Sequence, residues 1–484
     1  MKKLIILICV LLQAVVVLAE TVEIDGLRYD LNMDEKTASI SSGNSYKGIL
    51  VIPEIVTYQD IDYSVTTISG NAFIRNYGLL SVTIPNSVKK IGSHSFYECP
   101  SLASVKIGDG VETIGNSAFT FCGIVSIIIG NKVNFIDGNA FSGCSKITQV
   151  YISDLAAWCR ILFGDLTSNP LFYSRHLYLD KKEVKELVIP EGITEINSYA
   201  FAGASNILSL AINDEVTSIG DNAFNQCTSL NKVTFGNALT LIGAYAFNDC
   251  SSLESIQMTD GITTIEEGAF KGCSKLENLK LPENLKIIKG SAFQDCNSLT
   301  NLIIPSKVEF IYYSTFHNTS GNKLSVIMMP EYPPLAYDNS FPNGTKLYVP
   351  DTSIEPYESV APWSNMEIAT FSSSGPEKCA MPEIVYKKDK ISFNCETPDV
   401  EFHYTITTKD IANRQKGKET TVSAIYQVSV YATKEGYENS DLVTSEINIK
   451  GIKGDLTGDG IVNVADHVEL SNIIMTQQEN GTDN

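Results

Sequence analysis

The chain has 484 residues, which is more than one ordinary hydrophobic core organises, so we expect several domains or a repeat array. Its formal net charge is −20, from 36 basic and 56 acidic residues. This balance excludes nucleic acid as an expected partner, because affinity for nucleic acid depends on neutralising phosphates with basic side chains.

The first 19 residues have the layout of a secretory signal peptide. Two lysines precede an apolar run from Leu4 to Val17, and a Val17-Leu18-Ala19 cleavage site follows. The run is shorter than the roughly 20 residues that a membrane-spanning helix needs, and no later stretch resembles one. We therefore expect an exported protein, with a mature chain that begins at Glu20 and has no transmembrane segment.

One pattern recurs over residues 65–330, after a segment at 20–64 that lacks it and that we expect to be an N-terminal cap. Its phenylalanines lie 23 residues apart at Phe224, Phe247, Phe270, Phe293 and Phe316. A fixed period in this range predicts a solenoid of stacked units.

A single unit is not stable by itself. Burying about six side chains per unit contributes roughly 10 kcal/mol. That is less than the cost of ordering the backbone, on the order of 1 to 2 kcal/mol per residue. Each unit therefore needs its neighbours in order to fold.

Eleven cysteines in an exported chain would ordinarily favour disulfides. Seven of them, however, occupy one repeat position, three residues after the phenylalanine: Cys99, Cys122, Cys144, Cys227, Cys250, Cys273 and Cys296. Ala204 and Thr319 fill the same position elsewhere, which indicates a need for a small side chain. We expect a ladder of buried thiols, although coils about 4.8 Å apart leave some disulfides open.

An insert at 154–180, DLAAWCRILFGDLTSNPLFYSRHLYLD, interrupts the repeats. Two interpretations stay open. The insert is a packed lobe that covers the solenoid, or it is a protrusion whose aromatic side chains, Trp158 among them, anchor a partner.

The repeat ends in a strand, Leu-x-x-Val-x-Ile, whose Val and Ile point inward and whose flanking residues point outward. The 22 outward positions of 11 such strands hold three lysines and one acid, so this face is nearly neutral on an acidic chain. The last of these strands places Val326 and Met328 outward. Including Trp158 of the insert, the expected partner-binding residues are Lys106, Ile128, Tyr151, Val188, Trp158, Lys232 and Lys280. The alternative is that strands disfavour Asp and Glu for structural reasons alone.

Catalytic patterns are absent from the sequence. The five histidines lie in different contexts, and the motifs of zinc proteases, serine hydrolases and P-loop proteins do not occur. The carboxylates of a repeat form rows over a surface, whereas acid/base catalysis needs a shielded pair with separated pKa values. We expect no enzyme.

The repeat AFxxCxxLxxVxIP resembles the BspA-like leucine-rich repeats of bacterial surface proteins. The resemblance implies a solenoid with a parallel β-sheet on one face, closed by a C-terminal cap at 331–372 that contains Trp363. It also implies a secreted or cell-surface location on a bacterium and a role as an adhesin that binds host proteins.

Two further resemblances cover the C-terminal part. Short alternating strands at 379–450 predict a small all-β sandwich, within which Cys379 and Cys395 are candidates for a disulfide. This segment is similar to the immunoglobulin-like C-terminal module of chitobiase/hexosaminidase. Residues 454–475 resemble a single dockerin repeat, a short helical tail with a calcium loop. Its implied Ca²⁺ ligands are Asp455, Thr457, Asp459, the Ile461 carbonyl, Asn463 and Asp466.

Together these features predict a non-catalytic recognition scaffold, secreted or on the cell surface, that binds a host or matrix protein through the solenoid. The alternative is a glycan-binding component of an extracellular carbohydrate-processing assembly. In that case the dockerin-like end docks to a cohesin-like partner.

Overall fold

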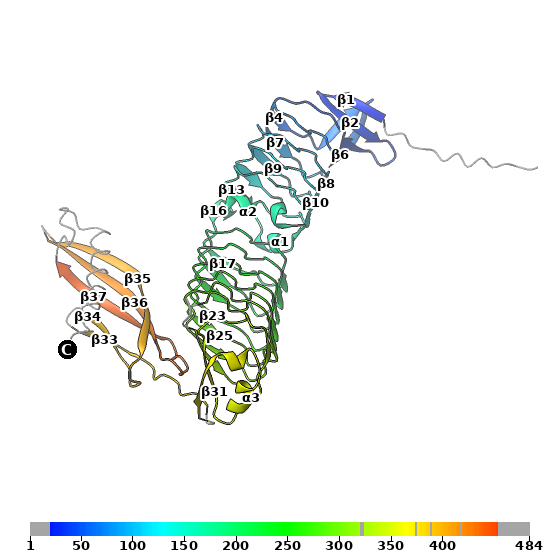
Figure 1. The fold of residues 1–484 in the computed structure, drawn as a ribbon. Helices are drawn as coiled ribbons and strands as arrows, with labels where there is room; N and C mark the ends of the chain where they lie inside the picture. Colours follow the sequence, from blue (N-terminus) through cyan, green and yellow to red (C-terminus); the bar gives the residue numbers. More distant parts are fainter. Residues whose placement is uncertain (1–19, 320–323, 373–374, 388–389, 417–418, 454–484) are drawn as a thin grey trace, which may run out of the picture. The chain divides into compact units, whose positions relative to one another are not determined.

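The computed structural model describes residues 20–319, 324–372, 375–387, 390–416 and 419–453 (Figure 1). The expected signal peptide at 1–19 and the expected calcium loop at 454–475 lie outside the described residues. The chain divides into two compact units. The first runs to Ser298 and also contains Phe310–Asn318, and the second holds Leu299–Glu309 and the chain from Thr319 onward.

The first unit begins with a small antiparallel layer. Asp25 and Gly26, with φ of 50° and 77°, form the two-residue turn between its first two strands, as a tight hairpin requires. The third strand (Thr37–Ile40) runs parallel to a strand at Ile61–Ile68, which also pairs with one at Ile55–Tyr58. Tyr29 and Tyr63 are each 1% exposed and fill the layer. Its strands are β1 (Glu20–Ile24), β2 (Leu27–Asn32), β3 (Thr37–Ile40), β5 (Ile55–Tyr58) and β6 (Ile61–Ile68).

Beyond β6, each coil contributes a two-residue strand to a parallel short-strand sheet, which is divided into separate runs after β14 and after β22. The second residue of nearly every strand is a buried isoleucine, which is the Ile of the repeat pattern. The strands are β8 (Lys90–Ile91), β10 (Thr113–Ile114), β12 (Phe135–Ile136), β14 (Leu162–Phe163), β18 (Glu195–Ile196), β20 (Ser218–Ile219), β22 (Leu241–Ile242), β24 (Thr264–Ile265), β26 (Ile287–Ile288) and β28 (Phe310–Ile311).

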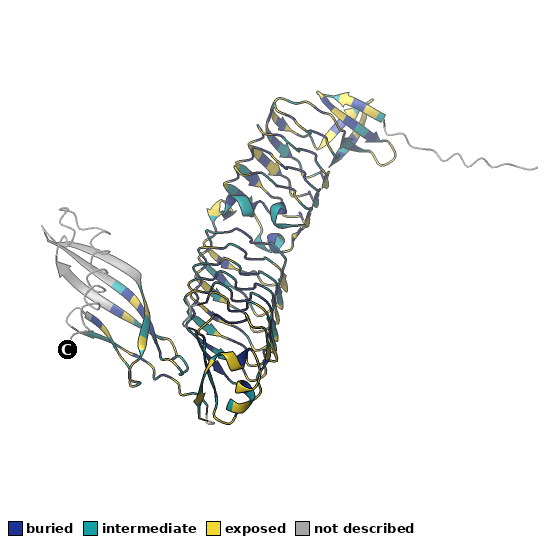
Figure 2. Ribbon diagram, in the orientation of Figure 1, coloured by how far each residue is buried: buried dark blue, intermediate teal, exposed yellow. Residues whose placement is uncertain are grey.

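The Leu-x-x-Val-x-Ile segments form the parallel long-strand sheet, in which most inward residues are buried, Val233 and Leu279 being half-buried, and their neighbours are not (Figure 2). This sheet has two runs in the first unit, divided between β16 and β17. The first run holds β4 (Gly48–Val51), β7 (Leu79–Ile84), β9 (Ser104–Ile107), β11 (Ser126–Ile128), β13 (Gln149–Ile152), β15 (Leu177–Leu179) and β16 (Lys182–Glu183). The second holds β17 (Glu186–Val188), β19 (Ser209–Ala211), β21 (Lys232–Thr234), β23 (Ser255–Gln257) and β25 (Asn278–Lys280).

The Ala-Phe-x-x-Cys segment joins the two sheets and forms a third column of contacts between coils. Rings of successive phenylalanines stack with centroids 5.1–5.5 Å apart and planes within 9° of parallel. Backbone N–H groups donate from coil to coil, as from Phe224 to the Ala246 carbonyl at 2.8 Å. The predicted parallel β-solenoid with a period of about 23 residues is confirmed.

The cysteine ladder consists of free, buried thiols, as the sequence predicted. Each Sγ donates to the carbonyl oxygen of the phenylalanine one coil earlier, at 2.9–3.3 Å. Burial raises the pKa of the Cys144 and Cys227 thiols from 9.0 to about 12. The thiols therefore act as small apolar groups that also satisfy a carbonyl.

The second unit contains a parallel sheet of β27 (Asn301–Ile304), β29 (Ser325–Met328), β31 (Lys346–Pro350) and β32 (Glu367–Phe371), with β30 (Leu335–Ala336), α3 (Ile354–Glu358) and η3 (Trp363–Asn365). Trp363 and Tyr357 are fully buried, and they donate to the carbonyls of Pro334 and Pro330 at 2.9 and 3.0 Å.

The expectation that Val326 and Met328 point outward is wrong, because both are 0% exposed. Asn301 follows Phe293 by 8 residues, whereas its register partner Ser325 follows Phe316 by 9. One additional residue shifts the strand by one position and thereby exchanges its two faces.

The C-terminal part of the second unit is all β. The hairpin of β33 (Glu383–Lys387) and β34 (Lys390–Asn394) packs against the antiparallel β35 (Glu401–Lys416), β36 (Glu419–Thr433) and β37 (Val443–Lys453) through a cluster that includes Ile391, Tyr426 and Val428. Cys379 and Cys395 are both free thiols, so the expected disulfide between them is wrong. The immunoglobulin-like character of this part stays a prediction.

The helices of the described residues are short, each spanning five residues or fewer. Within that part of the chain, no helix has the length and apolar character needed to cross a bilayer.

The buried thiols predict a specific loss of stability at alkaline pH. Above pH 9.0 the unfolded chain ionises Cys144 and Cys227, whereas the folded chain keeps them neutral up to about pH 12. Stability from these thiols is therefore fully present below pH 9.0 and falls as pH rises toward 12. Denaturant midpoints measured between these limits should fall more steeply for the wild type than for a Cys144→Ala/Cys227→Ala variant. Identical slopes would contradict the assignment.

Candidate functional site

The outward residues of the first long-strand run form a registered row. Thr83 lies opposite Lys106, Lys106 opposite Ile128, Ile128 opposite Tyr151, and Tyr151 opposite Tyr178. The parallel pairing of β7, β9, β11, β13 and β15 sets this register, because each strand aligns with its neighbour one coil away. We call Thr83, Lys106, Ile128, Tyr151 and Tyr178 the face row. Three of the residues predicted for partner binding, Lys106, Ile128 and Tyr151, are adjacent in it.

The insert-side end of the face row is aromatic and apolar. The rings of Tyr151 and Tyr178 lie 5.0 Å apart, with their planes 36° from parallel. Ile128 is 41% exposed, although an isoleucine on a polar strand face gains nothing from contact with water. Lys106 is also exposed. The row therefore presents two rings, a branched aliphatic side chain and one cation to solvent.

A polar row runs beside the face row. Ser81, Ser104 and Ser126 lie opposite one another and Gln149 follows, so small hydroxyl groups flank the exposed apolar side chains. Neither row of these strands contains a carboxylate. Hydroxyl and amide groups beside an apolar patch provide the kind of polar rim found at protein interfaces.

A carboxylate lies at the end of the face row and is already hydrogen-bonded. Glu183 on β16 lies opposite Tyr178, and its Oε1 is 2.6 Å from Nδ1 of His176. The hydrogen bond from His176 holds the pKa of Glu183 below its usual value. Partial burial and the Glu183 carboxylate raise the pKa of Tyr178, so this phenol is neutral at physiological pH.

The insert continues both sheets, so it is neither a separate lobe nor a protrusion. Its β14 pairs with β12 in the short-strand sheet, and its β15 pairs with β13 in the long-strand sheet. It folds into α1 (Leu155–Cys159) before β14, and into η1 (Leu166–Ser168) and α2 (Leu171–Ser174) between β14 and β15. The insert therefore supplies Tyr178 to the face row.

Two residues fasten the insert to the next coil. Asn169 is 0% exposed and donates from Nδ2 to the carbonyls of Tyr199 and Ala200, at 2.6 and 3.1 Å. Gly203 has φ of 84°, and a Cβ there would lie 2.8 Å from the Cα of Phe172 in α2. A side chain at residue 203 would therefore push α2 off the solenoid.

Trp158 does not belong to the exposed surface. It is 1% exposed, its indole Nε1 donates to the Ala200 carbonyl at 2.9 Å, and its ring contacts Phe163 at 5.4 Å. Helix α1, which lies between β13 and β14, places the tryptophan in the core. The expectation that Trp158 contacts a partner is replaced by a packing role.

The other predicted residues lie apart from the face row. Val188 is 63% exposed but stands on β17, which begins the second run of the sheet, and its row continues with Ala211 and Thr234. Lys232 is opposite Ser209 in the neighbouring row, and Lys280 is opposite Gln257 two strands further along. At about 4.8 Å per strand, these lysines are separate from the aromatic end.

The structure adds two aromatic positions that reach the surface, the half-buried Tyr178 and the exposed Phe121. Tyr178 is recognisable in the sequence only by the Leu-Tyr-Leu alternation inside the insert. Phe121 is 54% exposed, has a left-handed φ of 57°, and contacts Tyr97 edge-on at 6.1 Å. This position, two residues after the repeat phenylalanine, is left-handed in coil after coil, and it holds glycine at Gly143, Gly203 and Gly272 but polar residues such as Glu98 and Gln226 elsewhere.

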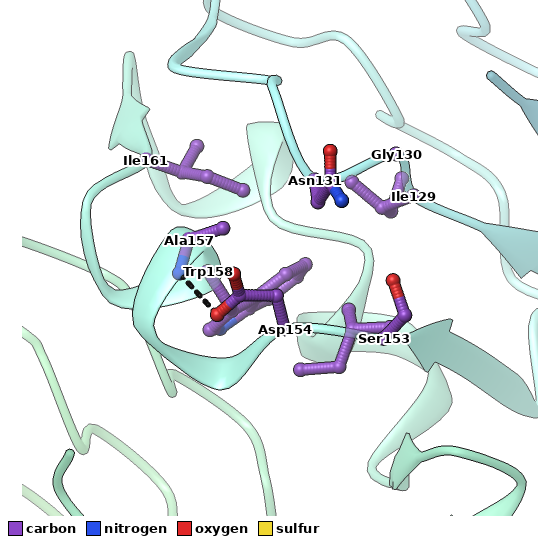
Figure 3. Close-up of a pocket in the computed structure, with 9 residues that line it drawn as sticks. Ile129, Gly130, Asn131, Ser153, Asp154, Ala157, Trp158 and Ile161 are labelled. Carbon is purple, nitrogen blue, oxygen red and sulfur yellow. Dashed lines mark hydrogen bonds between the residues drawn. The ribbon is translucent and has the colours of Figure 1, made fainter. Parts of the chain in front are cut away.

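A hollow beside α1 is too small for a typical ligand (Figure 3). Ile129, Asn131, Asp154 and Trp158 are among its lining residues, and the Asp154 carboxylate accepts a hydrogen bond from the Ala157 N–H at 3.0 Å. Its volume of about 170 Å³, which includes open solvent, is below the roughly 300 to 1,000 Å³ of small-molecule sites. The Asp154 carboxylate serves as the N-cap of α1.

The repeat region matches a known family. The model of the BspA type leucine rich repeat region matches residues 64–157 and 194–323, in six copies. The match stops inside the insert and resumes after it, so the segment that supplies Tyr178 departs from the family repeat. A search of curated proteins found no match.

Solved structures of similar repeat proteins come from several bacteria. A leucine rich cell surface protein of Faecalibacterium prausnitzii A2-165 is 24% identical, with 64% of this chain and 94% of that one covered and a TM-score of 0.37. The pneumococcal vaccine antigen PcpA is 19% identical, with 73% and 99% covered and a TM-score of 0.49. A leucine-rich repeat protein of Bacteroides ovatus ATCC 8483 is 23% identical, with 60% and 98% covered and a TM-score of 0.24.

Replacing Trp158 tests its packing role. Trp158→Ala should lower the free energy of unfolding by about 3 to 5 kcal/mol, because it removes a buried ring and its hydrogen bond to Ala200. The control is Phe121→Ala, which removes a ring that is 54% exposed and should cost much less. Denaturant unfolding of both variants measures the difference. Equal losses would show that Trp158 does not stabilise the insert.

Proposed function

We propose that this protein is a non-catalytic recognition scaffold of the bacterial cell surface, and that it binds a host or matrix protein through the face row. The observation that supports this most directly is the register of Lys106, Ile128, Tyr151 and Tyr178 across four neighbouring strands. It gathers side chains that are far apart in the sequence into one exposed patch.

The chemistry of the patch favours a protein partner. Tyrosine rings supply large contact areas with little loss of conformational entropy, and binding energy at protein interfaces concentrates on such anchors. Their supporting strands are held by backbone bonds on both sides, so the side chains are fixed in position before binding. Preorganisation of this kind lowers the entropic cost of association.

The absence of catalysis is part of the proposal. The described histidines are dispersed along the chain. His176 bonds Glu183, His403 lies 3.0 Å from the Thr433 hydroxyl, and His94 contacts Tyr97. These partners give the three histidines a structural setting, and the face row itself holds no histidine or carboxylate that could act as a general base for its hydroxyl and amino groups.

Substitutions in the face row should weaken binding without loss of stability. The double variant Lys106→Ser/Tyr151→Ser removes the cation and one ring, so affinity should fall about tenfold or more. Binding to immobilised extracellular-matrix proteins, measured by surface plasmon resonance, provides the readout, and thermal unfolding confirms the fold.

The matched control uses the second run of the same sheet. Gln257→Ser/Lys280→Ser changes a polar residue and a lysine in equivalent outward positions, away from the aromatic end. This control should bind as the wild type does. If both double variants bind equally well, the face row is not the binding surface.

A glycan-binding component that docks through the C-terminal end is the second candidate. The observation that favours it is the calcium-loop spacing of Asp455, Thr457, Asp459, Asn463 and Asp466. Binding of the wild type to a glycan array, together with calcium-dependent capture of a cohesin module, would favour this function over the first.

Calcium binding at that loop has a direct test. Asp455→Ala/Asp459→Ala removes two carboxylate ligands and should abolish calcium binding by the chelator-treated full chain in isothermal titration calorimetry. Asp154→Ala/Asp180→Ala removes two acids in the insert and is the control for net charge. Calcium binding that survives the first double substitution would place the ion elsewhere or exclude the loop.

A further inference from the structure

The N-terminal cap covers only one of the two sheets. Strands β1, β2 and β3 extend the short-strand sheet beyond β6, whereas the long-strand sheet ends at β4, which has β7 as its single neighbour among the described strands (Figure 1). The edge of β4 away from β7 is therefore open in the part of the chain that the structure describes.

The backbone of β4 identifies the groups at this edge. Gly48 and Ile52 donate to the carbonyls of Gly78 and Thr83 at 2.9 and 3.0 Å, so the even-numbered residues face β7. Successive residues of a strand direct their N–H and C=O groups to opposite sides. The N–H and C=O groups of Ile49 and Val51 therefore point to the open edge. Pro53 has no N–H, which leaves Ile49 and Val51 as the donors.

The side chains at this edge are apolar and exposed. Ile49 is 71% and Val51 is 65% exposed, whereas Leu50 between them is 2% exposed and packs inward. On the next strand, the residues opposite Ile49 and Val51 are Ser81 and Thr83. An edge strand with free backbone groups and apolar side chains is a template for another strand.

The net charge around β4 indicates which kind of partner strand would pair with its open edge. Residues 20–64, which contain the cap and β4, hold nine acidic and three basic residues, so their net charge is −6. A second copy of the chain would bring the same charge to the edge and be repelled. A segment rich in lysine or arginine would be attracted, and attraction of this kind also speeds encounter.

We propose that the open edge of β4 receives an extended, basic segment of another protein, which adds as a strand to the long-strand sheet. Its backbone bonds Ile49 and Val51, and its apolar side chains contact theirs, while its cations face the acidic cap. This site uses a backbone edge and not the face row, so it does not depend on the proposed function.

The probe is a short synthetic peptide that alternates valine with lysine, and its binding to the full-length chain is measured by fluorescence anisotropy. Binding should slow hydrogen exchange at the amides of Ile49 and Val51 in the wild type. Val51→Pro removes one donor from the open edge without touching the bonds to β7, and should weaken binding about fivefold or more. Val51→Thr keeps the N–H and is the matched control, with a smaller loss.

Several outcomes would overturn the proposal. These are failure of the basic peptide to bind, equal binding of a peptide with glutamate in place of lysine, or binding that leaves exchange at Ile49 and Val51 unchanged. The chain could also sediment as a dimer and show slow exchange at these two amides without peptide. That result would assign the open edge to a second copy of the chain. Because the exchange measurement uses the wild type, it decides the matter even if Val51→Pro does not fold.

Discussion

The structure depends on one constraint, which is that a coil satisfies its backbone only through its neighbours. A single repeat has two open sides, and besides the hydrogen bonds of its own turns, its backbone bonds run to residues about one period away. At Phe224 the N–H donates to Ala246 at 2.8 Å, and the carbonyl accepts from the Cys250 thiol at 3.3 Å. The 23-residue period, the stacked rings and the thiol ladder all follow, because each requires equivalent positions to coincide from coil to coil.

The insert shows how much variation this constraint permits. Its length and sequence depart from the repeat, yet β14 and β15 keep the alignment of both sheets. The segments on both sides of β14 changed, with Trp158 in α1 before it and Asn169 after it, where the Ala-Phe-x-x-Cys segment would follow the short strand. Because the alignment survived, the new strand places Tyr178 against Tyr151 on the open face. A change in the core connection thus produced a change in the exposed surface.

The two units differ in how the end of the long-strand sheet is covered. In the second unit, Trp363 and Tyr357 are buried against the last strands and bond main-chain carbonyls. In the first unit, the cap joins the short-strand sheet and leaves β4 without a strand on its outer edge among the described residues. Native proteins usually cover or charge such edges, since unpaired strands promote association. The open edge and the face row belong to the same sheet, so both bring potential partners to one side of the first unit.

Much of this protein was determined by its sequence alone. The spacing of Phe224 to Phe316 predicted the solenoid and its period, and the shared position of seven cysteines predicted buried thiols. Alternation along each strand predicted that Lys106, Ile128 and Tyr151 point outward. These features are readable because the pairing between coils is periodic, so a position in one repeat implies the same position in the next.

Where the repeat is interrupted, only the tertiary structure decided which side chains are buried and which strand edges are open. Trp158 is as aromatic as Tyr178, but helix α1 buries the first whereas β15 leaves the second partly exposed, and composition cannot distinguish them. One additional residue before Ser325 exchanged the faces of β29, and the open edge of β4 depends on which sheet the cap joins. In each case the outcome depends on pairing between segments distant in the chain. Such pairing follows from packing and strand register, which local sequence does not specify once the repeat is lost.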